Sequence, residues 1–337
     1  MITRRAALVT GATFLAVPGA RAQERIPVRI GYVPVIGASP LFVMVGAGWA
    51  REAGLDIALT KFESGPPAIQ ALASGTLDML FIGVAPIAVA RSKGLPVRIV
   101  AAAGVGGSGF AVQAPLAAAF EAAGGRAREA FAAFRAKAGR PAKLGILPPG
   151  ATPTVALRYW LKQNGVSPDD VTFAAMGIEA VQQAMLTGAV DGGTVLEPAL
   201  TIVQSRKPDV KTIAFAPEMY PNLPGVVVSA TESFLARHFD AVATVVKLSA
   251  RARDLILAEP AKAALHVQTI LSGGLVDSAL YERALRSKAL KFVIDPRTIV
   301  QATQDSLAFE VEIGDFPKAP STEGLFDPRA YDKAMAG

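Results

Sequence analysis

The residues best placed to do chemistry in this chain lie in short turns of glycine, proline and other small residues, each just ahead of an expected helix. Such turns let a ligand approach the backbone closely because their side chains are small. The helix starts that follow offer free N–H groups and a positive dipole end, which suit an anion. A single turn of this kind is ordinary loop punctuation, but several in two matched series favour a binding cleft. The turns read GASP (37–40), SGPP (64–67), GVAP (83–86), PPGATP (148–153), GIEA (177–180) and LEPA (196–199).

Three glutamates, Glu63, Glu179 and Glu197, stand in or beside these turns, which contain no lysine or arginine. Backbone donors favour a sulfonate, a carboxylate or a similar anion, whereas the glutamates suit an amine or a hydroxyl. Together they predict a zwitterion or an amine-bearing organic acid rather than nitrate or bicarbonate. The alternative for each glutamate is a solvated carboxylate stabilised by a helix start. That alternative is the preferred interpretation for Glu179, and ligand contact is preferred for the other two.

Motifs for catalysis, metals and cofactors find little support. The chain has no cysteine, which excludes disulfides, thiolate chemistry and cysteine-ligated metals. His238 and His266 have no spacing typical of a metal site or a triad. GVGGSG (104–109) satisfies G-x-G-x-x-G, but FAVQAP follows and predicts a strand where a dinucleotide site requires a helix. We expect no enzyme activity, cofactor or metal.

The N-terminus has the pattern of an export signal. MITRRAALVTGATFLAVPGARAQE has a charged start, an apolar centre over 6–17 and a small-x-small site at 20–22. The apolar centre is too short for a membrane span, which needs about 20 residues. The two arginines fit a twin-arginine signal as well as a general secretory one, and the route stays open. We expect a signal peptide over 1–22, cleaved after Ala22, and a periplasmic protein.

Charge gives little support to nucleic-acid binding. The formal net charge is +6, from 34 Lys and Arg against 28 Asp and Glu. Three of these arginines lie in the signal segment, and 34 less 3 leaves 31 basic residues and a charge of about +3. No run of five or more basic residues occurs, so the sequence lacks the patch that such partners require.

The mature chain alternates strands and helices, which is typical of an α/β fold. Apolar strands between amphipathic helices indicate parallel sheets covered on both faces, and 337 residues predict two lobes rather than one small core. The first helix is expected to run unbroken over 39–54. A helix–strand–helix unit occurs twice, over 68–94 and 180–207. Each copy passes through Gly-x-x-Asp and reaches a proline ahead of its second helix.

Several stretches resemble the substrate-binding proteins of nitrate/sulfonate/taurine-type ABC importers, and the resemblance covers nearly all of the mature chain. It implies a periplasmic binding protein type II fold, with two lobes, each a mostly parallel sheet flanked by helices, and a two-strand hinge. Lobe one would comprise 26–108 plus 230–337 and lobe two 109–229, with hinge strands near 107–113 and 225–230. The stretches are VRIGYVPVIGASPLFVMVGAGWAREAGLDIAL, ESGPPAIQALASGTLDMLFIGVAP, GATPTVALRYWLKQNGVSPDDV, DGGTVLEPAL and FVIDPRTIVQATQDSLAFEVEIGDF.

The resemblance also implies which residues touch the ligand. Leu196 stands where relatives often carry a tryptophan, which leaves an aromatic wall at that point in doubt. The implied contacts are Ile36, Gly37, Ser39 and Pro40 in the first turn, Glu63, Ser64 and Gly65 in the second, Val84, Ala85 and Pro86 in the third, Gly150, Ala151 and Thr152 at a helix start of lobe two, with Glu179 nearby, and Glu197.

The expected function is capture of a small organic anion or zwitterion, sulfonate- or taurine-like or a carboxylate, for an ABC permease and its ATPase in the inner membrane. The resemblance implies a monomer. An exported sensor that presents its ligand to a membrane receptor is an alternative that the sequence does not separate from this. An enzyme acting on a pyrimidine precursor is a third class, which the absence of placed histidines, cysteines or metal ligands disfavours.

Overall fold

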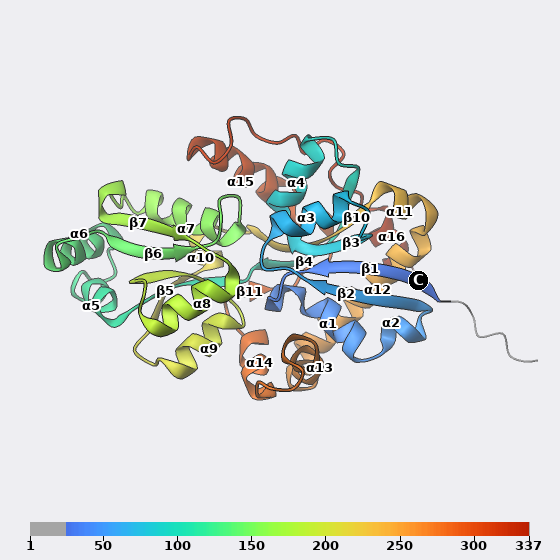
Figure 1. The fold of residues 1–337 in the computed structure, drawn as a ribbon, viewed down its shortest axis with the longest axis horizontal. Helices are drawn as coiled ribbons and strands as arrows, with labels where there is room; N and C mark the ends of the chain where they lie inside the picture. The colour runs from blue at the N-terminus through green and yellow to red at the C-terminus, as the bar shows by residue number, and fades with distance from the viewer. Residues whose placement is uncertain (1–24, 337) are drawn as a thin grey trace, which may run out of the picture.

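The computed structural model describes residues 25–336, which form two sheets side by side, each flanked by helices (Figure 1). The predicted signal segment lies outside the described residues. A six-stranded sheet has the order β11-β4-β10-β3-β1-β2, and a five-stranded sheet has the order β7-β6-β8-β5-β9. We call the first sheet with its helices the first lobe, and the second sheet with its helices the second lobe. The predicted α/β class with two sheets is confirmed.

Both ends of the described chain belong to the first lobe, whose strands are β1 (Ile26–Tyr32), β2 (Leu55–Lys61), β3 (Met79–Gly83), β4 (Val97–Gly106), β10 (Pro224–Thr231) and β11 (Leu290–Lys291). Its helices are α1 (Ser39–Gly46), α2 (Trp49–Glu52), α3 (Gly65–Ala73), α4 (Val84–Ser92), α11 (Glu232–Arg237), α12 (Phe239–Ala258), α13 (Pro260–Ser272), α14 (Ser278–Leu285), α15 (Val300–Glu312) and α16 (Arg329–Met335), with short 3-10 turns η1 (Ile36–Ala38) and η3 (Pro296–Ile299).

The second lobe is built from the middle of the chain, with strands β5 (Ser108–Val112), β6 (Ala142–Ile146), β7 (Val171–Ala175), β8 (Gly192–Leu196) and β9 (Lys211–Phe215). Its helices are α5 (Ala114–Ala122), α6 (Ala127–Ala138), α7 (Thr152–Gln163), α8 (Ile178–Thr187), α9 (Ala199–Arg206) and α10 (Ala216–Met219), with the 3-10 turn η2 (Pro168–Asp170).

The chain crosses between the sheets twice. It leaves the first sheet at Gly107, between β4 and β5, and returns over 216–223, between β9 and β10. The segment 225–230, predicted as a hinge strand, belongs wholly to the first sheet, so the second crossing precedes it. Both β5 and β10 run antiparallel to their neighbours, which makes each sheet mixed rather than parallel throughout. The division into two moving lobes stays a prediction.

The repeated sequence unit forms the same structure in each lobe. It gives α3–β3–α4 in the first lobe and α8–β8–α9 in the second. The aspartate of Gly-x-x-Asp makes the same kind of contact in both copies, accepting hydrogen bonds from a backbone N–H and from an arginine side chain. Asp78 accepts hydrogen bonds from the backbone N–H and the side chain of Arg29 in β1, and Asp191 accepts them from the N–H of Lys143 in β6 and from Arg140. Each carboxylate, just before its own strand, is therefore hydrogen-bonded to a residue of a neighbouring strand.

The expected single helix over 39–54 is broken into α1 and α2. Gly48 has φ +77°, a left-handed conformation that ends a helix and that glycine adopts without strain. The amphipathic pattern continues across the break, so periodicity alone did not reveal it.

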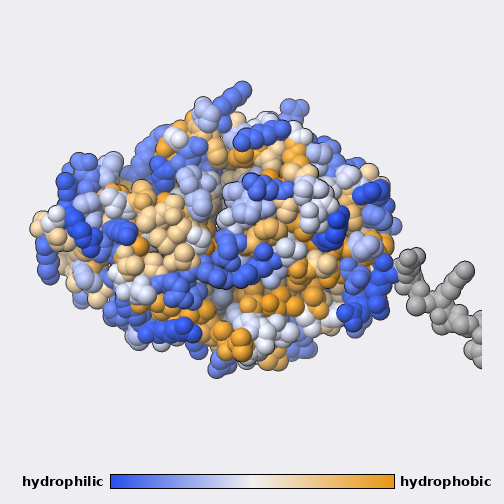
Figure 2. All heavy atoms as spheres, viewed as in Figure 1, coloured by the Kyte–Doolittle hydropathy of each residue, from blue (hydrophilic) through white to orange (hydrophobic). Residues whose placement is uncertain are grey.

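The buried apolar residues form two clusters, one that joins the core of the first lobe to α8, β8 and α9 of the second, and one within the second lobe. The cluster of the second lobe is rich in aromatic rings, with Phe110 stacked on Phe131 at 6.2 Å and Trp160 tilted against Phe110 at 5.6 Å. On the face shown in Figure 2, hydrophilic residues cover much of both lobes. No helix in the part of the chain that the structure describes is long and apolar enough to cross a membrane.

Candidate functional site

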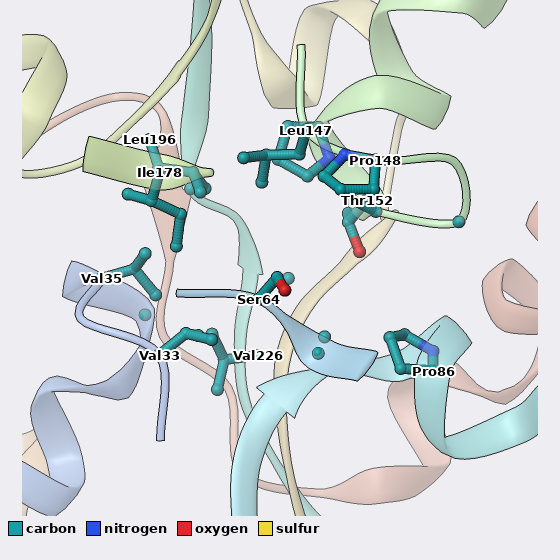
Figure 3. Close-up of a pocket in the computed structure, with 18 of the residues that line it drawn as sticks. Val33, Val35, Ser64, Pro86, Leu147, Pro148, Thr152, Ile178, Leu196 and Val226 are labelled. Carbon is teal, nitrogen blue, oxygen red and sulfur yellow. The ribbon is translucent and has the colours of Figure 1, made fainter. Parts of the chain in front are cut away.

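A cavity lies between the two lobes, where strands of both sheets end and helices begin (Figure 3). The space between the lining atoms is about 770 Å³, and part of it is open to solvent. The position agrees with the rule that ligands of open α/β sheets sit beyond the carboxyl ends of the strands. Residues of both lobes must therefore contact any molecule held there.

The first lobe forms its side of the cavity from four places. These are the segment after β1, the start of α3, the turn from β3 into α4, and the crossing strands. Their lining residues are Val33, Val35, Gly37, Ser64, Gly65, Pro66, Gly83, Pro86, Gly106, Gly107, Gly225 and Val226.

The second lobe contributes the loop from β6 into α7, the start of α8 and the end of β8. Its lining residues are Leu147, Pro148, Pro149, Gly150, Ala151, Thr152, Pro153, Ile178 and Leu196. Thr152 lies close to the first lobe, with its Oγ1 3.6 Å from the position that a Cβ at Gly83 would take. The two lobes therefore approach each other closely at the cavity.

The lining is apolar. Among the described residues, none that lines the cavity is an aspartate, glutamate, lysine, arginine or histidine. Two hydroxyls supply the polar side chains, Ser64 from the first lobe and Thr152 from the second, and both are drawn at the cavity in Figure 3. Within residues 25–336, no three acidic or histidine side chains come together in a way that could hold a metal ion.

Seven of the predicted contact residues line the cavity, namely Gly37, Ser64, Gly65, Pro86, Gly150, Ala151 and Thr152. They come from four of the predicted turns, three within residues 37–86 of the first lobe and one at residues 150–152 of the second. The structure therefore brings these turns of the two lobes to one place. The other eight predicted residues do not line it: Ile36, Ser39, Pro40, Glu63, Val84, Ala85, Glu179 and Glu197.

Glu197, a predicted ligand contact, lies outside the lining of this cavity. Its carboxylate is buried against α9, where Oε2 accepts hydrogen bonds from the N–H of Thr201 at 3.1 Å and from its hydroxyl at 2.8 Å. It lies in a separate hollow that Ser287 and Lys288 also line. Burial raises the pKa of this carboxyl above its usual value. The side chain lies outside the cavity lining, and the backbone carbonyl accepts a hydrogen bond from the N–H of Ile36 in the first lobe at 2.8 Å.

Glu63 and Glu179 lie beside the same lysine, Lys61, and do not line the cavity. Lys61, at the end of β2 in the first lobe, donates to Glu179 Oε1 in the second lobe at 2.8 Å and lies 3.4 Å from Glu63 Oε1. The hydrogen bond and charge of Lys61 lower the pKa of Glu179. These three side chains, which we call the Lys61 bridge, join the lobes on their solvent-exposed side.

A second set of contacts joins the lobes through α7 and α15. Arg158 pairs with Asp315 and donates to the carbonyl of Ile313 at 2.9 Å, and Lys162 pairs with Glu312. Beside them, Glu310 is buried with its Oε2 unpartnered within the described residues. That atom lies 3.5 Å from the position that a Cβ at Gly150 would take, directly behind the cavity loop.

Sequence reasoning missed the apolar half of the lining. Val33, Val35, Leu147 and Leu196 lie at or just past strand ends, and Ile178 begins a helix. Their position after a strand was the available signal. An apolar residue in such a place also fits the core, and the choice depends on how the lobes face each other.

Comparison with known proteins assigns the chain to a family. The model of the NMT1-like family matches residues 21–271, well over half of the chain. The chain belongs to the NMT1-like family. A relative from Brucella abortus (strain 2308), whose name provisionally calls it a binding protein, is 25% identical over 260 residues, which is 76% of this chain and 75% of the relative.

Solved structures of other proteins have the same fold as this NMT1-like protein. The periplasmic nitrate-binding protein NrtA from Synechocystis PCC 6803 has a TM-score of 0.77 at 16% identity, covering 93% of this chain and 89% of that one. The alkanesulfonate-binding protein SsuA from Xanthomonas axonopodis pv. citri, bound to MOPS, has a TM-score of 0.70 at 18% identity, covering 91% and 99%. The predicted periplasmic binding protein fold is confirmed.

Proposed function

We propose that this NMT1-like protein is the exported solute-binding component of an ABC import system, which captures a small organic molecule between its lobes. The observation that carries the proposal is the cavity, since it is lined by residues of both lobes at the strand ends where this fold places its ligands. Relatives named as nitrate- and sulfonate-binding proteins support the assignment.

The proposed partners rest on a second group of similar proteins. These are named as ATP-binding proteins of nitrate import or of bicarbonate transport. A permease and an ATPase in the inner membrane are therefore the proposed recipients, and the periplasm is the proposed location. A ligand shifts the lobes toward closure only through contacts that are better in the closed form. The paired lining from two lobes supplies such contacts.

The ligand class expected from the sequence, an organic anion or zwitterion, depended on Glu63, Glu179 and Glu197 and on free N–H groups at helix starts. The glutamates lie outside the lining. The capture function does not depend on them, and the chemistry of the ligand is argued separately below.

The test is a comparison of two leucine-to-tryptophan variants of the protein purified from the periplasm. Leu196→Trp fills the cavity, and Leu257→Trp adds the same bulk on α12, where the leucine is exposed. A ligand at a thousand times its dissociation constant stabilises a protein by about 4 kcal/mol. We expect a panel of small organic molecules, screened by thermal shift, to stabilise the wild type and Leu257→Trp but not Leu196→Trp.

Native mass spectrometry of the same preparations identifies any molecule that co-purifies. A wild-type protein that is both empty and unresponsive to the whole panel would contradict capture. Equal stabilisation of both variants by one compound would place its binding outside the cavity.

A further inference from the structure

The composition of the lining bears on the ligand itself, given the proposed capture function. The side chains at the cavity are mainly aliphatic or proline, with Val35, Leu147 and Val226 each almost completely buried. Moving an ion out of water into such surroundings is very unfavourable unless an opposite charge or several hydrogen bonds compensate it. Among the described residues, the lining offers no opposite charge.

Proline further removes several of the backbone donors that an anion would need. The first four N–H groups of a helix lack partners within it and commonly bind anions, but proline has no N–H. In α3, the two residues after Gly65 are Pro66 and Pro67. In α4 the third residue is Pro86, and in α7 the second is Pro153.

The loop before α7 uses its own donors. The N–H of Ala151 donates to the carbonyl of Pro148 at 3.1 Å, and the N–H of Thr154 donates to that of Ala151 at 2.9 Å. The start of α7 therefore retains the N–H of Thr152 near the cavity, and α8, which begins at Ile178 without a proline, retains its first N–H groups. These donors can serve one hydrogen-bonding end, but no charged side chain among the described residues lines the cavity to balance an ion.

An acid stands behind the cavity loop and does not help either kind of ion. Glu310 lies behind Gly150 and does not line the cavity. Burial, and then the charge of Asp315, raise its pKa to about 8, so near neutral pH this carboxyl is mainly protonated. It offers little attraction to a cation, and any ionised fraction repels an anion.

From these observations we infer that the cavity binds an uncharged, largely apolar organic molecule with a single hydrogen-bonding end, rather than an oxyanion or an amine. The hydroxyls of Ser64 and Thr152 receive that end. A hydroxyl both donates and accepts, so the pair suits an amide, a carbonyl, an alcohol or a ring nitrogen. Because one hydroxyl belongs to each lobe, a ligand held by both also favours closure. This inference rests on the proposed capture function.

The test uses sets of probes that share one apolar skeleton and differ in whether the end group is neutral, negative or positive. The amide, the carboxylate and the amine of a phenyl, a cyclohexyl and a hexyl skeleton are titrated by calorimetry at pH 7, with nitrate and methanesulfonate alongside. For each skeleton that binds, we expect the amide to bind at least tenfold more tightly than either ion. A carboxylate, an amine or an inorganic anion that binds as tightly as the amide overturns the inference and leaves the capture function standing.

Two variants connect the preference to the lining. Leu196→Lys introduces a cation at the cavity and should move the preference at least tenfold toward the carboxylate, whereas Leu257→Lys, on the exposed face of α12, should leave it unchanged. Thr152→Val removes one hydroxyl at nearly constant volume. It should weaken the amide several-fold without strengthening the ions, and it tests the inference even where Leu196→Lys fails to fold. An unchanged preference in both folded variants overturns the inference.

If no probe binds, the molecule found by native mass spectrometry in protein from the periplasm decides the matter. A molecule uncharged at pH 7 supports the inference, and an ionic one overturns it. An empty protein that binds no probe overturns this inference and counts against the capture function as well.

Discussion

At the scale of single residues, Glu310 shows how burial sets a charge. Its carboxyl is buried between α15 and the cavity loop, and Oε2 has no partner within residues 25–336. Burial and the charge of Asp315 raise its pKa to about 8, while Arg158 opposes the rise. The folded protein therefore keeps a proton that the unfolded chain releases near the usual value of 4.5.

This difference makes stability depend on pH. Between pH 4.5 and 8 the folded state binds more protons than the unfolded state at this residue, so the free energy of unfolding falls as the pH rises. The maximum slope from one group is about 1.4 kcal/mol per pH unit. Glu310→Gln removes the ionisable group at similar volume, and its unfolding free energy should fall less steeply than that of the wild type across this window.

Chemical denaturation at pH 4, 6 and 8 measures the effect. Relative to the wild type, the unfolding free energy of Glu310→Gln should increase from pH 4 to pH 6 and again from pH 6 to pH 8. Glu52→Gln, at an exposed position in α2, is the matched control and should track the wild type at every pH. A constant difference between Glu310→Gln and the wild type would show that this carboxyl titrates normally.

At the scale of elements, the Lys61 bridge joins the last residue of β2 to the first turn of α8. Lys61 and Glu179 are both about half or more exposed, and exposed ion pairs contribute about 0.2–1 kcal/mol, less as salt screens them. Because the pair joins the lobes, the proposed opening of the lobes would break it, and its contribution would belong to the closed form. Glu179→Gln should therefore speed ligand release by up to about fivefold.

Stopped-flow dissociation at low and at 1 M salt tests this. We expect the effect of Glu179→Gln to shrink at high salt. Glu129→Gln removes an exposed ion pair with Arg126 inside one lobe and should leave the release rate unchanged. A strong loss of equilibrium affinity in Glu179→Gln that persists at 1 M salt would instead restore this glutamate as a direct ligand contact.

At the scale of the whole molecule, the proposed capture function predicts that the lobes separate and close around a ligand. A Cβ at Gly177 in the second lobe would lie 3.7 Å from the Cβ of Glu63 in the first, which matches the spacing across a disulfide. The chain has no cysteine of its own. Glu63→Cys combined with Gly177→Cys should therefore form a single cross-lobe disulfide under oxidising conditions and trap the closed form.

The trapped protein should exchange its ligand at least tenfold more slowly, and reductant should restore the rate. Each single-cysteine variant is a control for the substitution itself. Full oxidation with unchanged exchange would show that ligand enters without separation of the lobes at this edge.

The alternation of strands and helices, the duplicated helix–strand–helix unit and the glycine- and proline-rich turns at the strand ends could be predicted from the sequence alone. These features depend on local backbone preferences and on hydrophobic periodicity, both of which a single chain displays. The turns around Gly37, Ser64, Pro86 and Thr152 were predicted for this reason, and all four residues line the cavity. The break in the first helix at Gly48 was not predicted, because the apolar pattern continues through it and only the backbone conformation reveals it.

Which side chains face the cavity could not be predicted without the folded structure. Glu197 follows a strand that ends there, yet its carboxylate turns to Thr201, while the neighbouring Leu196 lines the cavity. Glu63 and Glu179 are far apart in sequence and become partners of Lys61 only when the lobes meet. The direction of a side chain at a strand end depends on what packs against it from the other lobe, and that information is not local to the sequence.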